Sequence, residues 1–326
     1  MRRREFISLI GVVAATWPLA VRAQQPALPV IGFINSGWSG EPYPPLSAFI
    51  KGLGETGFVE GSNVAIEYRW AEGRHERLPV LIADLVQRKV SVIAATSTPA
   101  AVAAKAANTP VPVVFTTGGD PARMGLVSSL ARPGANVTGV STLNIEVSAK
   151  RLELMHEVLP AANNFALLIN PSDPLATAAS QTTGTAANAL GLKLHVLPVT
   201  SEQDFGATFD SLVKLKADAL VIATASFFNA FEGELGRLSL SHRVPTIYEH
   251  PEFTAAGGLM SYSGDLAEAY RAAGVQVGLI LKGKKPAELP VQQITKVRLI
   301  INLKTAKALG ITFPLSLLGR ADEVIE

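Results

Sequence analysis

The apolar positions of this chain fall into short runs that alternate with longer segments of helical spacing. The run from Leu28 to Asn35 is rich in β-branched residues and ends at a Ser-Gly pair, which is typical of a buried strand. The segment 75–89 repeats its apolar residues at three- and four-residue intervals, which predicts a helix. The same reasoning predicts strands at 28–35, 63–70, 90–95, 111–116, 165–170, 192–199, 219–223, 246–248 and 258–262, and helices at 45–56, 75–89, 98–107, 148–158, 175–190, 202–216, 229–243 and 266–282.

The order of these elements predicts the fold class. Strand and helix alternate from residue 28 to residue 116, which favours a parallel sheet with helices on both faces. The same order recurs after residue 148, so we expect an α/β protein with two Rossmann-like lobes. The stretch 137–142 joins them without a flexible linker and is itself strand-like, which is typical of lobes that hinge around a cleft. A second strand-like stretch, 290–301, is a candidate for a late crossing.

The N-terminus predicts export from the cytoplasm. Three arginines at 2–4 precede an apolar run from Ile7 to about Val21, and a small residue, Ala23, follows where a signal peptidase would cut. We therefore expect residues 1–23 to form a signal peptide that is cleaved after Ala23. An amphipathic or anchoring helix is the alternative. The stretch 3–7 also resembles the twin-arginine pattern, and the choice between that route and general secretion stays open.

Composition narrows the possible partners and chemistry. The chain has 326 residues, 48% of them hydrophobic and 17% charged, so a large core is expected and disorder is not. The leader holds four arginines and one glutamate, so the formal net charge of +2 falls to about −1 without it, and no basic patch suggests nucleic acid. The sequence contains no cysteine, which excludes disulfides and thiolate metal sites. No later apolar run reaches the ~20 residues of a membrane span.

Polar and aromatic side chains follow most of the expected strands. Ligands of open α/β sheets bind beyond the carboxyl ends of the strands, so these positions predict the lining of a cleft. The candidate binding residues there are Ser36, Ser97, Thr98, Thr116, Thr117, Asp120, Asp173, Phe227, Tyr248 and Glu249.

These candidates suggest a small zwitterion or polar metabolite. Ser97 or Thr98 begins a helix, whose exposed N–H groups and dipole favour an anion. The hydroxyls at 116–117 and the glycines that follow them suit a carboxylate, whereas the acidic positions could meet an ammonium. Trp38 follows the first strand and could stack on a ligand or simply pack. The alternative for individual residues is that they cap helices and form turns.

Catalytic motifs are scarce. The sequence lacks a phosphate-binding GxxxxGK[ST] loop, a GxGxxG turn after a strand, a GxSxG nucleophile elbow and an HExxH zinc motif. The five histidines are scattered and form no pair at helical spacing. We therefore expect no metal, no cofactor and no enzymatic activity.

Several long stretches resemble a known family. They include LPVIGFINSG, GFVEGSNVAIEYRWAEG, VPVVFTTGGDPARMGLVSSLARPGANVTGVS and INLKTAKALGITFPLSLLGRADEVIE. The chain resembles ABC-transporter substrate-binding proteins of the type I periplasmic binding fold, in the group that includes tryptophan- and tyrosine-type binding components. The similarity covers nearly the whole chain.

The resemblance implies a two-lobed receptor with three crossings, residues 27–141 plus 263–289 in lobe one and 142–262 plus 290–326 in lobe two. It also implies that Ser97, Thr98, Thr116 and Thr117 hold a ligand carboxylate, and that Asp173, Phe227, Tyr248, Glu249 and Tyr262 close over it. An ABC permease with its ATPase would be the partner of a periplasmic monomer.

The resulting hypothesis is a periplasmic solute receptor for an amino acid or related carboxylate. Phe227, Phe228 and Tyr248 slightly favour an aromatic or branched ligand. One rival is an exported α/β enzyme, which the absence of a nucleophile–base pair or metal cluster disfavours. Another is the effector-binding core of a transcription regulator, which the export signal and the lack of a helix-turn-helix disfavour.

Overall fold

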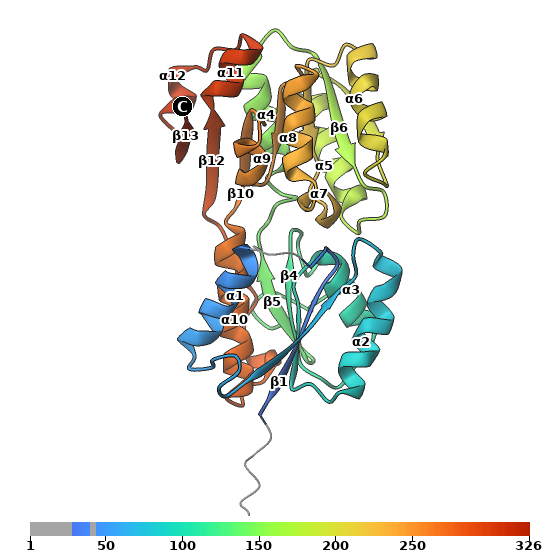
Figure 1. The fold of residues 1–326 in the computed structure, drawn as a ribbon, viewed down its shortest axis with the longest axis vertical. Coiled ribbons are helices and arrows are strands. Elements are labelled where there is room, and N and C mark those ends of the chain that lie inside the picture. The colour runs from blue at the N-terminus through green and yellow to red at the C-terminus, as the bar shows by residue number, and fades with distance from the viewer. Residues whose placement is uncertain (1–27, 40–43) are drawn as a thin grey trace, which may run out of the picture.

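The protein folds into two α/β lobes stacked end to end (Figure 1). The structure, a computed structural model, describes residues 28–39 and 44–326, so the expected leader at 1–23 lies outside the described residues. In the described part of the chain, no helix is long and apolar enough to cross a membrane.

The first lobe is built on a six-stranded parallel sheet with the order β11-β5-β4-β3-β1-β2. Helices cover both faces of this sheet, as the alternating pattern predicts. Its elements are β1 (Val30–Asn35), α1 (Pro44–Glu55), β2 (Ala65–Trp70), α2 (Leu78–Gln87), β3 (Val92–Ala95), α3 (Thr98–Ala106), β4 (Val113–Thr117), β5 (Val137–Ser141), α10 (Leu266–Leu281) and β11 (Gln292–Gln293), with short 3-10 turns at His75–Arg77 and Pro286–Glu288.

The second lobe is built on a seven-stranded sheet with the order β13-β12-β10-β9-β8-β6-β7. Its pairs are parallel, as expected, except that β12 runs antiparallel to β10 near one edge. Its elements are α4 (Ser148–Val158), β6 (Asn164–Ile169), α5 (Ala176–Ala189), β7 (Lys193–Pro198), α6 (Asp204–Lys214), β8 (Ala219–Ile222), α7 (Ser226–Asn229), α8 (Glu232–Ser241), β9 (Thr246–Tyr248), α9 (Pro251–Ala255), β10 (Met260–Gly264), β12 (Val297–Asn302), α11 (Leu303–Leu309), α12 (Leu315–Leu318) and β13 (Glu323–Ile325).

The chain crosses between the lobes three times, after β5, after β10 and after β11. Two of the expected boundaries are displaced. β10 stays in the second sheet through Gly264, so the crossing comes after that residue rather than at 262. The stretch 290–301 is two strands, because Gln292 and Gln293 pair with β5 of the first sheet before β12 joins the second.

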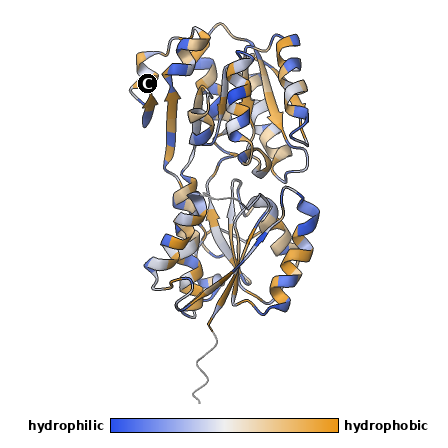
Figure 2. Cartoon of the chain, in the orientation of Figure 1, coloured by the Kyte–Doolittle hydropathy of each residue, from blue (hydrophilic) through white to orange (hydrophobic). Residues whose placement is uncertain are grey.

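Apolar clusters lie on both faces of each sheet and form the cores of the lobes. Figure 2 shows strands at the centre of the lobes in orange, whereas the helices carry both hydrophobic and hydrophilic residues. α10 returns to the first lobe after the second crossing and packs closely on α1. A Cβ on Gly52 of α1 would lie 1.9 Å from the carbonyl oxygen of Arg271, so only glycine permits this approach.

Candidate functional site

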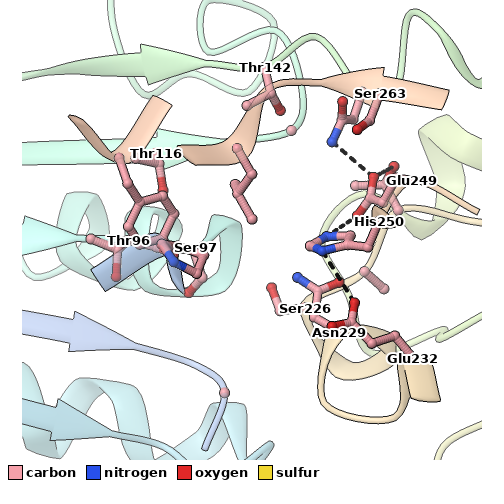
Figure 3. A pocket seen from close by; sticks show the side chains of 18 of the residues that line it. Thr96, Ser97, Thr116, Thr142, Ser226, Asn229, Glu232, Glu249, His250 and Ser263 are labelled. Carbon is pink, nitrogen blue, oxygen red and sulfur yellow. Dashed lines mark hydrogen bonds and ion pairs between the residues drawn. The ribbon is translucent and has the colours of Figure 1, made fainter. Parts of the chain in front are cut away.

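A cavity of about 650 Å³ lies between the two lobes. Its lining comes from the carboxyl ends of β1, β3 and β4 in the first lobe and from the segments after β6, β8 and β9 in the second. The edges of both sheets therefore meet at one site, as expected for open parallel sheets. Figure 3 shows the side chains of the two lobes facing each other across this space. The volume falls within the usual range of pockets for small molecules.

The first-lobe wall is formed partly by the N-terminus of α3. Ser97 caps this nine-residue helix, with its Oγ accepting hydrogen bonds from the backbone N–H of Ala100 at 3.4 Å and of Ser36 at 3.1 Å. A hydroxyl has one proton to donate in addition to its lone pairs, so Ser97 can still donate to an anion. The helix dipole adds a partial positive charge at the same place. This part of the wall suits a carboxylate.

Three threonine hydroxyls extend the same wall. The Oγ1 atoms of Thr98 and Thr117 lie 3.1 Å apart, and Thr98 also accepts a hydrogen bond from the N–H of Gly118. Thr116 lines the cavity, and among the residues described its hydroxyl has no protein partner. Its proton therefore remains available for a ligand.

The second-lobe wall contains a buried carboxylate, Glu249. Its Oε2 accepts hydrogen bonds from Thr224 at 2.6 Å, Asn144 at 2.9 Å and Arg151 at 3.3 Å. Burial would raise the pKa of Glu249, but hydrogen bonding with His250 and the charge of Arg151 outweigh it and lower this pKa. Glu249 therefore carries a negative charge at neutral pH.

His250 lies between two carboxylates. Its Nδ1 is 3.3 Å from Oε2 of Glu232, and its Nε2 is 3.5 Å from Oε1 of Glu249 (Figure 3). Burial would lower the pKa of His250, but these two acidic groups raise it to about 9. Burial raises the pKa of Glu232 to about 7. The positive charges of Arg151 and His250 offset those of the two glutamates, so this wall offers carboxylate oxygens to a cation without a large net negative charge.

Asp173 adds a second buried carboxylate to the same wall. It is 4% exposed and accepts hydrogen bonds from the N–H groups of Leu175 at 2.9 Å and Ser226 at 3.3 Å. Burial nevertheless raises the pKa of Asp173 to about 7. A cation in the cavity would favour the ionised form of this group.

One group of side chains among the described residues has the composition of a metal site. Ligand atoms of Glu232, His250 and Glu252 lie within 4.8 Å of one another. Both ring nitrogens of His250 already face carboxylates, and the raised pKa keeps the ring protonated. A metal would have to displace the ring proton and both ion-pair contacts of His250, so the arrangement fits an ion-pair network better than a metal centre.

The structure brings six of the eleven predicted residues into the cavity lining. These are Ser97, Thr98, Thr116, Thr117, Asp173 and Glu249. All six lie at the end of a strand or in the segment that follows it, which explains why the sequence could indicate them.

Two other predicted residues from the first lobe lie outside the lining. Ser36 is buried and supports the site through its backbone N–H bond to Ser97. Asp120 accepts hydrogen bonds from the N–H groups of Ala122 at 2.8 Å and Arg123 at 3.2 Å. Asp120 thus stabilises the turn after β4 instead of facing a ligand.

The three predicted aromatic residues of the second lobe also lie outside the lining. Phe227 and Tyr248 belong to an apolar core of that lobe, and the hydroxyl of Tyr248 donates to Oδ1 of Asn229 at 2.5 Å. Tyr262 packs against the other core, while its backbone carbonyl accepts a hydrogen bond from Arg151 at 2.8 Å. Tyr248 and Tyr262 lie in strands β9 and β10, where neighbouring side chains point to opposite faces, whereas Phe227 turns into the core from helix α7.

Sequence reasoning missed several residues of the site. The lining residues it did not select include Asn144, Asn229, Glu232, His250 and Tyr270. His250 lies two residues after a strand and could have been found by that signal. Arg151 is a fully buried arginine within α4, and nothing in the sequence distinguishes it from a surface residue of an amphipathic helix.

Comparison with known proteins agrees with this architecture. The sequence model of a family described as ABC transporter substrate binding protein matches residues 43–325. A tyrosine-binding protein of Clostridioides difficile (strain R20291) is 28% identical over 262 residues, which cover 80% of this chain and 75% of that protein.

Two solved structures are similar over 91% of the chain. One is the ABC domain in complex with L-Trp from Streptococcus pneumonia, with a TM-score of 0.80, 25% identity and 100% of that chain covered. The other is a conserved domain protein from Vibrio cholerae, with a TM-score of 0.82, 25% identity and 99% of that chain covered.

Proposed function

The chain belongs to the family of ABC transporter substrate-binding proteins, and we propose that it binds an aromatic L-α-amino acid in the interlobe cavity. It is a binding protein and not an enzyme. The bound amino acid would be passed to a membrane permease that is driven by an ATPase. The effector-binding and enzymatic alternatives are set aside by family membership.

The observation that carries this proposal is the unequal chemistry of the two walls. The first lobe offers hydroxyls and the N-terminus of α3, which suit a carboxylate. The second lobe offers Asp173, Glu232 and Glu249, which suit an ammonium. An α-amino acid carries both groups on one carbon and can therefore bridge the walls.

Aromatic residues on the cavity wall support an aromatic side chain on the ligand. Trp38, Trp70 and Tyr270 all line the space. The tyrosine-binding relative and the L-Trp complex point in the same direction.

Binding would work by closing the lobes. The lobes are joined by three chain crossings, which allow a hinge motion. A ligand that touches both walls binds the closed form better than the open form and shifts the population toward it. The closed and liganded form would then dock on the permease as a monomer.

The same proposal places the protein in the periplasm. It rests on the arginine-led apolar leader and the expected cleavage after Ala23. The intact mass of the exported protein tests this directly. A mass that still includes residues 1–23 would contradict it, and blocking the twin-arginine route would show which pathway is used.

Calorimetric titration of the exported protein tests the ligand. We expect binding of L-tryptophan, L-tyrosine or L-phenylalanine, and about 10- to 100-fold weaker binding of tryptamine and indole-3-propionate, which lack the carboxylate and the ammonium, respectively. Thr116→Val should weaken the binding of the amino acids and leave the binding of tryptamine unaffected. Thr185→Val, an exposed substitution on α5, is the matched control. Equal affinity for tryptamine and tryptophan, or no binding of any of the three, would refute the proposal.

A further inference from the structure

Trp38 contacts both lobes at once. It belongs to the loop after β1 in the first lobe and lines the cavity, yet its ring packs against an apolar core of the second lobe. Its ring centroid is 5.3 Å from that of Phe231, with the planes at 73°, and 6.4 Å from that of Phe227. Edge-to-face geometry at these distances is favourable for aromatic pairs. Because the partners belong to different lobes, opening the cleft would break the contact.

Backbone contacts within the first lobe fix the position of the Trp38 indole. Gly73 has a φ of +73°, and a Cβ there would lie 2.5 Å from Cη2 of Trp38. The N–H of Gly73 donates to the carbonyl of Ser36 at 2.8 Å, and the N–H of Glu72 donates to the carbonyl of Gly37 at 2.9 Å. These bonds join the loop after β1 to the turn after β2. The indole is thus seated on the backbone of its own lobe and presented to the other.

The second lobe presents a preformed aromatic surface to this ring. Phe231 lies between α7 and α8, half-buried, with its centroid 5.1 Å from Phe227 and 5.4 Å from Phe205. Neither Phe227 nor Phe231 lines the cavity. A substitution at Phe231 therefore changes the surface that receives Trp38 without removing a cavity wall.

We propose that Trp38 is a specificity-determining residue whose indole forms a wall for the ligand side chain and also an aromatic latch, made of Trp38, Phe227 and Phe231, that holds the lobes closed. This inference rests on the proposed function for the identity of the ligand, but not for the existence of the latch. An aromatic ligand against the indole extends the same cluster, whereas a small side chain leaves one face of Trp38 without a partner. Ligand size and lobe closure are thereby coupled through one side chain.

Interlobe distance measurements test the latch independently of any ligand. The chain has no cysteine, so Val80→Cys on α2 and Val213→Cys on α6, at positions 71% and 53% exposed, allow specific labelling of one site in each lobe. Single-molecule energy transfer then gives the ratio of closed to open molecules, without ligand and with L-tryptophan. Trp38→Ala and Phe231→Ala are compared, and Phe58→Ala, a half-buried aromatic of the first lobe away from the cavity, is the control.

We expect Phe231→Ala to lower the closed-to-open ratio about 2- to 12-fold, and the double variant that also carries Trp38→Ala to match Trp38→Ala alone. Phe58→Ala should leave the ratio unchanged. L-tryptophan affinity should fall in Phe231→Ala in proportion to the measured fraction of closed molecules. Labels that never approach in the wild type, an unchanged ratio in Phe231→Ala, or additive effects of the two substitutions would overturn the latch. Failure of L-tryptophan to bind, with the ligand-free ratio still shifted, would overturn only the proposed ligand.

Discussion

Removing the guanidinium of Arg151 is expected to destabilise the second lobe strongly. This side chain is fully buried, and it donates to Glu249 at 3.3 Å, to Thr224 at 3.3 Å and to the carbonyl of Tyr262 at 2.8 Å. Arg151→Met would leave Glu249, which is 3% exposed, as a buried carboxylate without that cation. Breaking one side of a buried ion pair costs about 3–5 kcal/mol. The remaining donors, Thr224 and Asn144, favour the lower end of this range.

Urea unfolding followed by circular dichroism measures this loss. The control is Arg320→Met, which breaks an exposed pair with Glu157 in the same lobe and should cost less than about 1 kcal/mol. Arg151→Met combined with Glu249→Gln should recover part of the stability, because the buried charge is then gone, with a coupling of about 1–3 kcal/mol.

The pH dependence of the stability difference between wild type and Arg151→Met is an independent test of this ion pair. In the wild type the folded pKa of Glu249 lies below its unfolded value, so its stabilising contribution is present above pH ~4.3 and is lost as pH falls. Without Arg151, the folded pKa of Glu249 is higher than in the wild type, although His250 still lowers it, so the ionised group is less stabilised and the loss appears as pH rises. The stability difference between wild type and Arg151→Met should thus grow from pH 5 to pH 8. A difference below about 1 kcal/mol, or one that grows toward acid, would refute this account of the pair.

Three further predictions concern the cavity and the lobe contacts. Affinity for an amino acid should rise from pH 6 to pH 8, since Asp173 and Glu232, each with a pKa of about 7, must be ionised to hold an ammonium. Calorimetry should show a smaller rise in Asp173→Asn, and an affinity that rises toward acid would contradict the prediction. Gly118→Ala should weaken ligand binding by hindering closure, because the new methyl would lie 3.0 Å from Cγ2 of Thr224 in the second lobe. Unchanged affinity in a calorimetric titration would argue against this prediction. Gly52→Ala should lower the free energy of unfolding by about 1–3 kcal/mol, because the carbonyl of Arg271 occupies the space that the new methyl needs. If urea unfolding gives the wild-type free energy, α1 and α10 can separate enough to accept the methyl, and the prediction is wrong.

The pattern of apolar residues was sufficient to predict the fold but only part of the site. Glu249 and Tyr248 are adjacent at the end of β9, and the sequence selected both. Glu249 reaches the cavity, whereas Tyr248 is fully buried in the core. Which of two neighbours faces the ligand depends on the direction in which the strand leaves the sheet. Sequence periodicity does not contain that direction at a strand of only three residues.

The sequence by itself determined the alternation of strands and helices, the division into two lobes and the family. Local apolar periodicity and long motifs carry that information, and both are readable without knowing any distant contact. Only the tertiary structure decided where the chain crosses between lobes and which side chains meet. Arg151 and Glu249 are 98 positions apart, and Trp38 meets Phe231 from the opposite lobe. The first pair forms only when α4 packs on the second sheet, and the second forms only because the two sheets turn their carboxyl edges toward each other.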